Sequence, residues 1–119
     1  MITVLLADDN ETMRNAIVGI LRDDPEVKLL AQASSFIQTM DLASTLHPQV
    51  VLMDLYKRDE RNVIPFQIKS CLLGCVLIAI SLRNDNEAKA LAESFGAVAL
   101  LDKVNLATDL IPAIKLHAN

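Results

Sequence analysis

Five polar side chains that can take part in chemistry follow apolar runs of this chain: Asp8, Asp9, Asp54, Ser81 and Lys103. Three carboxylates brought within a few ångströms of one another repel, and protonation or a bound cation relieves the repulsion. Mg²⁺ prefers oxygen ligands and keeps water and room for a phosphate oxygen. A lysine ammonium and a serine hydroxyl are donors that hold phosphoryl oxygens. If the five side chains meet, they form a site for a metal ion and a small phosphoryl group, in which one carboxylate could be the nucleophile.

The elements that must bring these residues together are short buried strands. The apolar runs cover residues 2–7, 50–53, 76–80 and 98–101. A continuous apolar run of this length is typical of a strand buried on both faces, and such strands belong to parallel sheets. Ligands of an open parallel sheet bind in the crevice beyond the carboxyl ends of its strands. We therefore expect the five side chains to converge at that edge, although they lie far apart in sequence.

Segments with helical spacing separate the runs. A stripe at helical spacing predicts a helix that begins near Asn10 or Thr12 and ends before Pro25. Residues 27–31 alternate in polarity, which favours a strand at the sheet edge. Further helices are predicted around residues 37–46, over 63–73, around 88–95 with Gly96 as the C-cap, and over 106–116 with Thr108 as a candidate cap.

Strand and helix alternate five times, which predicts an α/β fold with a five-stranded parallel sheet and helices on both faces. Two strand orders are common in such folds. In the 2-1-3-4-5 order the first and third strands are neighbours, so Asp8, Asp9 and Asp54 would lie side by side. Residues 1–119 are expected to form a single domain, since 52% of the residues are hydrophobic and no linker or repeat interrupts them.

Composition argues against several other classes of protein. A net charge of -4 lacks the basic footprint of direct nucleic-acid binding. The longest apolar stretch, residues 71–82, is too short to span a membrane, and no secretory signal is present, so we expect a cytoplasmic protein. None of the three glycines precedes a Lys-Ser or Lys-Thr pair, which excludes a glycine-rich nucleotide loop. Cys71 and Cys75 are predicted to be buried apolar residues rather than metal ligands.

Each candidate site residue also has a structural interpretation. Asp9, Asn10 or Thr12 could cap the first helix, and Lys103 could be a solvated end. That interpretation explains any one residue well. It explains poorly why four apolar runs all end at a group that can do chemistry.

The chain resembles the receiver domain of bacterial response regulators. The resemblance rests on a set of motifs and extends from Thr3 to about Leu116. The motifs are Leu5-Leu6-Ala7-Asp8-Asp9, Val50-Val51-Leu52-Met53-Asp54-Leu55, Ile80-Ser81, and Gly96-Ala97 followed by Lys103. The spacing is closest in pattern to regulators that carry a helix-turn-helix output domain. The resemblance implies the flavodoxin-like receiver fold and a phosphoacceptor domain of a two-component system rather than an enzyme.

The same resemblance implies a role for each residue of the site. Asp54 would receive a phosphoryl group from a sensor histidine kinase or a phosphotransfer protein. Asp9 and Asp54 would ligate Mg²⁺ together with the backbone carbonyl of Tyr56, while Asp8 would act mostly through water. Ser81 would hydrogen-bond the phosphoryl oxygens, and Lys103 would pair with them. A homodimer and an output domain outside this chain remain open, and no membrane partner is expected.

Two departures from the family pattern lie close to the site. Leu82 follows Ser81 where the family usually has a small residue, which predicts narrower access for the phosphoryl group. Leu100 stands where the family commonly has an aromatic switch residue. Both departures favour one alternative, a pseudo-receiver that binds partners without phosphorylation. A second alternative is a Mg²⁺-dependent phosphotransferase or phosphatase, although that class usually has a second acid where this chain has Tyr56.

Overall fold

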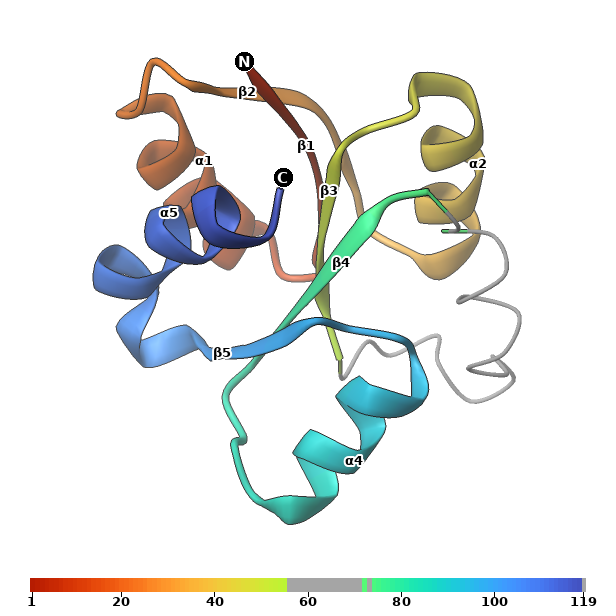
Figure 1. Cartoon of the computed structure of the whole chain (residues 1–119), viewed down its shortest axis with the longest axis vertical. Coiled ribbons are helices and arrows are strands. Elements are labelled where there is room, and N and C mark those ends of the chain that lie inside the picture. The colour runs from red at the N-terminus through yellow and green to blue at the C-terminus, as the bar shows by residue number, and fades with distance from the viewer. Residues whose placement is uncertain (56–71, 73, 119) are drawn as a thin grey trace.

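The computed structural model of the chain describes residues 1–55, 72 and 74–118 (Figure 1). Tyr56 lies outside the described residues, and so does the helix predicted over residues 63–73, except for Leu72. Strands and helices alternate along most of the chain. In chain order they are β1 (Ile2–Ala7), α1 (Glu11–Arg22), β2 (Val27–Ala33), α2 (Phe36–Leu46), β3 (Val50–Asp54), β4 (Val76–Ser81), α4 (Asn86–Ser94), β5 (Ala99–Asp102) and α5 (Leu106–His117).

The five strands form one parallel sheet in the order β2-β1-β3-β4-β5. The predicted α/β fold class and parallel sheet are therefore confirmed, as is the 2-1-3-4-5 strand order of the flavodoxin-like fold that the family resemblance implies. The register pairs Ala7 with Met53, so the residues that follow them, Asp8 and Asp54, leave neighbouring strands at the same level. Ser81 is paired with Asp102 on the other side of the sheet centre, one residue before Lys103.

Helices cover both faces of the sheet (Figure 1). Alternate residues of each central strand point to opposite faces, as the pleat of a strand requires. Val4 and Leu6 of β1 belong to the apolar cluster beneath α1 and α5, whereas Leu5 belongs to the cluster beneath α2 and α4. In the second cluster the rings of Phe36 and Phe95 meet edge to face, with centroids 6.1 Å apart. The central strands are thus buried on both sides, which explains their continuous apolar runs.

Side-chain caps begin three of the helices. Asn10 accepts a hydrogen bond from the Met13 N–H at the start of α1, and Ser35 and Asp85 cap α2 and α4 in the same way. Such a cap satisfies one of the N–H groups that have no partner within the helix. The predicted start of the first helix is confirmed.

The last helix starts where it was predicted to start but does not have the candidate cap. It begins at Leu106, so Thr108 lies inside α5 and is not its cap. A single 3₁₀ turn over Lys103–Asn105 precedes the helix, and Asp102 caps that turn by accepting the Val104 N–H. Pro112 also lies inside α5 and has no N–H to donate to the preceding turn. In the part of the chain that the structure describes, no helix has the length and apolar character needed to cross a bilayer.

Candidate functional site

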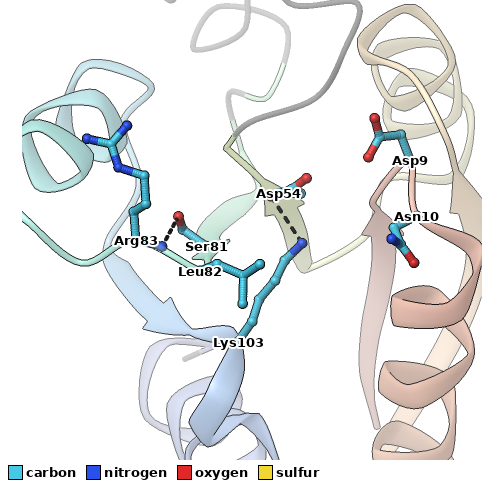
Figure 2. Close-up of a pocket in the computed structure, with 7 residues that line it drawn as sticks. All are labelled: Asp9, Asn10, Asp54, Ser81, Leu82, Arg83 and Lys103. Atoms are coloured by element: carbon cyan, nitrogen blue, oxygen red, sulfur yellow. Dashed lines mark hydrogen bonds and ion pairs between the residues drawn. The ribbon is translucent and has the colours of Figure 1, made fainter.

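The five predicted site residues meet at the carboxyl edge of the sheet. Asp8 and Asp9 follow β1, Asp54 ends β3, Ser81 ends β4, and Lys103 follows β5. Four of them, Asp9, Asp54, Ser81 and Lys103, line an open hollow of about 270 Å³, drawn in Figure 2, while Asp8 is buried behind it. The residues that line this hollow are Asp9, Asn10, Asp54, Ser81, Leu82, Arg83 and Lys103. Convergence of strand ends, predicted from the apolar runs, thus produces one polar site.

The three carboxylates form a compact acidic cluster. One oxygen from each of Asp8, Asp9 and Asp54 lies within 4.8 Å of the other two. The Asp8 side chain has no exposed surface and that of Asp54 is 7% exposed, while Asp9 is the most open of the three. Like charges this close destabilise one another in a partly buried setting. A cation beside the cluster, or protonation of one carboxylate, relieves this repulsion.

Lys103 supplies one compensating charge within the protein. Its Nζ lies 2.9 Å from Asp8 Oδ2 and 3.3 Å from Asp54 Oδ1 (Figure 2 shows the second contact), and its side chain is only 7% exposed. Burial, the largest influence on this ammonium, lowers its pKa. The hydrogen bond to Asp8 and the charges of Asp54 and Asp8 together outweigh burial, so the pKa of Lys103 lies above its ordinary value. Lys103 is therefore favoured in its charged form, and its ion pairs join β5 to β1 and β3.

Asp8 is anchored at each of its polar atoms. Its N–H donates to the Ala33 carbonyl (3.0 Å), and its own carbonyl accepts from Arg14 Nη1 (2.7 Å). Oδ1 accepts the N–H of Asn10 at 2.9 Å, and Oδ2 has the ion pair with Lys103. Apart from that ion pair, the buried Oδ2 accepts no well-aligned hydrogen bond in the described part of the chain. Asp8 thus holds the acidic loop in place and keeps one oxygen able to accept a further partner.

Ser81 is buried at the end of β4 and lines the hollow, with its hydroxyl beside the backbone nitrogen of Arg83 (Figure 2). Its Oγ accepts the backbone N–H of Arg83 at 2.9 Å, which closes a tight turn after the strand. The hydroxyl proton can still be donated to another oxygen. The guanidinium of Arg83 points away from Asp54 and pairs with Asp85 (2.8 Å) and Glu87 (3.1 Å) at the start of α4.

The donor set fits a hard divalent cation. The three carboxylates supply oxygen ligands of the type that Mg²⁺ prefers, and the most open of them, Asp9, leaves room for water. Within this set, the buried Asp8 Oδ2, apart from its ion pair with Lys103, accepts no hydrogen bond from the described residues and can take a further partner. Tyr56, whose carbonyl the family resemblance adds to this set, lies outside the described residues.

Leu82 and Leu100, the two departures from the family pattern, lie at the rim of the hollow and against the core. Leu82 is 69% exposed and lines the hollow beside Ser81. Leu100 is half-buried and packs against the apolar cluster beneath α2 and α4. Cys75 packs against the same cluster, and burial raises the pKa of its thiol, which agrees with the predicted apolar role. Cys71 lies outside the described residues.

Sequence reasoning missed Arg14. It lies on α1 and reaches back to the Asp8 carbonyl, a contact between positions six apart. A helical stripe does not reveal it, because Arg14 is polar and lies beside that stripe. The one sequence signal for this contact was a basic residue, Arg14, in the first turn of a helix that follows Asp8 and Asp9.

Comparison with known proteins supports the receiver assignment. The transcriptional regulatory protein LiaR of Bacillus subtilis is 27% identical over 117 residues, which is 97% of this chain and 55% of that protein. A protein-glutamate methylesterase/protein-glutamine glutaminase of Rhizobium etli is 38% identical over 103 residues, or 84% of this chain and 29% of that protein. The chain thus spans about half or less of the length of these relatives. No protein-family profile matches it.

Among solved structures, the signal receiver domain of the response regulator NarL from Mycobacterium tuberculosis superposes with a TM-score of 0.87. The two chains are 22% identical, and the match covers 98% of this chain and 95% of the other. At this identity the likeness establishes the fold. The motifs at the strand ends and the placement of their side chains are separate observations that agree with it.

Proposed function

We propose that this chain, a response-regulator receiver domain of a two-component system, accepts a phosphoryl group on Asp54 and thereby switches an output. The observation that carries the proposal is the position of the Lys103 ammonium. It lies between two nearly buried carboxylates, Asp8 and Asp54, at the ends of adjacent strands and beside an open hollow. A purely structural ion pair would not need a third, more open carboxylate or a hollow lined by a hydroxyl.

The proposed reaction is transfer of a phosphoryl group to a carboxylate. An oxygen of Asp54 attacks the phosphorus of the donor phosphohistidine, a P–O bond forms, and the P–N bond breaks. The imidazole leaves with the electron pair of that bond and takes up a proton. Mg²⁺ bound at the acidic cluster would neutralise charge on the transferring phosphoryl oxygens. The Ser81 hydroxyl donates to one of these oxygens.

Lys103 changes partners in this proposal. Before transfer it shares its charge between Asp8 and Asp54. After transfer, Asp54 is an acyl phosphate whose negative charge has moved to the phosphoryl oxygens, and Lys103 follows that charge. Because Lys103 begins the 3₁₀ turn that leads into α5, its movement is linked to the end of β5. Ser81, whose hydroxyl turns toward the phosphoryl group, is linked in the same way to the turn at Arg83.

The partners follow from the same assignment. A receiver implies a histidine kinase, or a phosphotransfer protein, as the phosphoryl donor. LiaR is a transcriptional regulatory protein and the Rhizobium etli relative a methylesterase, and each is longer than this chain. We therefore propose that the receiver acts on an output outside these residues and is not itself an enzyme with an external substrate.

Labelling with a small phosphodonor tests the proposal. With Mg²⁺ and acetyl phosphate, the wild type should gain the mass of one phosphoryl group, and Asp54→Asn should gain none, because an amide is not a nucleophile. Asp41→Asn, which removes an exposed carboxylate from α2, is the matched control and should label like the wild type. Failure of the wild type to label, in a mixture where another receiver is labelled, would favour a pseudo-receiver.

A further inference from the structure

The loop that carries Asp8 and Asp9 is held by a side chain from α1. We propose that Arg14 is a positioning residue that fixes this loop in the geometry needed to bind Mg²⁺. The inference rests on the proposed function, because it concerns the metal that assists phosphoryl transfer. It assigns to α1 a part in the site beyond that of the strand-end residues.

The contact that carries the inference is short and charge-assisted. Arg14 Nη1 donates to the Asp8 carbonyl at 2.7 Å in a partly buried position. Hydrogen bonds from a charged donor are shorter and about twice as strong as neutral ones. The backbone of Arg14 is itself fixed, since its N–H donates to the Asn10 carbonyl at 2.9 Å in the first helical turn. The side chain therefore links a rigid helix to the acidic loop.

This contact fixes one of the two peptide groups that flank Asp9. The peptide group before Asp9 contains the Asp8 carbonyl, which Arg14 holds. The peptide group after Asp9 contains the Asn10 N–H, which donates to Asp8 Oδ1 at 2.9 Å. With both flanking groups restrained, the backbone of Asp9 has little freedom to turn. The most open carboxylate of the cluster is thus aimed by its neighbours.

Arg14 can act on metal binding in two opposite ways. As a positive charge near the cluster, it would repel Mg²⁺, so its removal would strengthen binding. As a clamp on the loop, it would hold the Asp9 carboxylate beside Asp8 and Asp54, so its removal would weaken binding. Groups that orient metal ligands typically contribute about 10- to 100-fold to metal affinity. Because Arg14 holds the backbone of the loop and not a ligand oxygen, we expect the lower end of that range.

The experiment measures Mg²⁺ affinity by calorimetric titration for the wild type, Arg14→Gln, Arg14→Lys and Arg22→Gln. Arg22 is exposed in the last turn of the same helix and serves as the matched control. We expect Arg14→Gln to weaken Mg²⁺ binding about tenfold, Arg14→Lys to lie between it and the wild type, and Arg22→Gln to bind like the wild type. Urea unfolding with EDTA shows whether each variant is folded before titration.

A second readout separates positioning from general damage. In acetyl phosphate labelling, the Mg²⁺ concentration for half-maximal rate should rise in Arg14→Gln, while the rate at saturating Mg²⁺ should return close to that of the wild type. Unchanged or tighter Mg²⁺ binding in Arg14→Gln would overturn the inference and leave the proposed function intact. If that variant does not fold, unchanged binding in Arg14→Lys has the same meaning. Absence of Mg²⁺ binding in the wild type would instead refute the proposed metal site itself.

Discussion

Removal of the Asp9 carboxylate should stabilise the protein in the absence of divalent cations. Asp9 is the most open member of the acidic cluster, and one of its oxygens lies within 4.8 Å of both Asp8 and Asp54. At that separation two unit charges repel by about 1 kcal/mol in water and by about 3.5 kcal/mol at the effective dielectric near a protein surface. The two repulsions together cost roughly 2 to 7 kcal/mol.

Two attractions offset part of this repulsion. Lys103 Nζ is in contact with both neighbouring carboxylates, so it also attracts Asp9, and we take that attraction as equal in size to one of the two repulsions. Asp9 also precedes the N-terminus of α1, where a negative charge gains about 0.3 to 1 kcal/mol from the helix dipole. Asp9→Asn should therefore raise the free energy of unfolding by about 1 to 2 kcal/mol, which for a domain of this size is a melting temperature higher by several degrees.

The assay is urea unfolding of the wild type and Asp9→Asn, each with EDTA and with excess Mg²⁺. A ligand that binds only the folded state stabilises it in proportion to the logarithm of its concentration. Mg²⁺ should thus stabilise the wild type strongly and Asp9→Asn weakly, so that the difference between them narrows or reverses. Asp41→Asn, on α2, should show neither effect. A variant that is no more stable than the wild type in EDTA, or that gains equally from Mg²⁺, would refute the proposed repulsion and ligand set.

Three further predictions concern other parts of the molecule. The backbone N–H of Glu26 and the ammonium of Lys115 hold the pKa of Asp24 below its ordinary value of 3.8. The Asp24 carboxylate should therefore stabilise the fold above pH 3.8, and this contribution should be lost as the pH falls through the lowered pKa. A difference in unfolding free energy between the wild type and Asp24→Asn that did not shrink on acid titration would contradict this. Leu100→Tyr should enlarge the changes in amide hydrogen exchange that beryllofluoride induces around α4, because leucine has no ring to swing between two packing positions. A change around α4 that is already large in the wild type would count against this prediction. His47→Gly should raise the free energy of unfolding by about 0.5 to 1 kcal/mol, because residue 47 has a left-handed backbone (φ 50°) that glycine adopts without strain. An unchanged or lower free energy of unfolding in urea would exclude such strain.

The sequence was sufficient to predict the sheet and the meeting of its strand ends. Strands buried on both faces must be apolar throughout, so the first polar residue after each run marks the carboxyl edge. This is why Asp54 and Ser81 could be placed together from residues 50–53 and 76–80. The edge position of β2 was predicted for the same reason, since only a half-exposed strand alternates in polarity. The strand itself extends to Ala33, two residues beyond the predicted end.

Contacts that depend on side-chain reach could not be predicted. The bond from Arg14 to the Asp8 carbonyl requires the position of α1 relative to the loop, which no local pattern contains. The cap of the last helix was predicted wrongly at Thr108 for a related reason. A 3₁₀ turn capped by Asp102 supplies the transition from β5, and the helix then begins at Leu106 without a side-chain cap.

Chemical trapping of the phosphorylated residue tests the central claim most directly. An acyl phosphate is reduced by borohydride to an alcohol, so a phosphorylated aspartate becomes homoserine, whereas phosphoserine and free carboxylates are left unchanged. After incubation with Mg²⁺ and acetyl phosphate, followed by borohydride and peptide mass spectrometry, we predict homoserine at position 54 and at no other aspartate. Homoserine at Asp8 or Asp9, or none anywhere while the intact protein carries a phosphoryl group, would contradict the assignment of Asp54 as the phosphoacceptor.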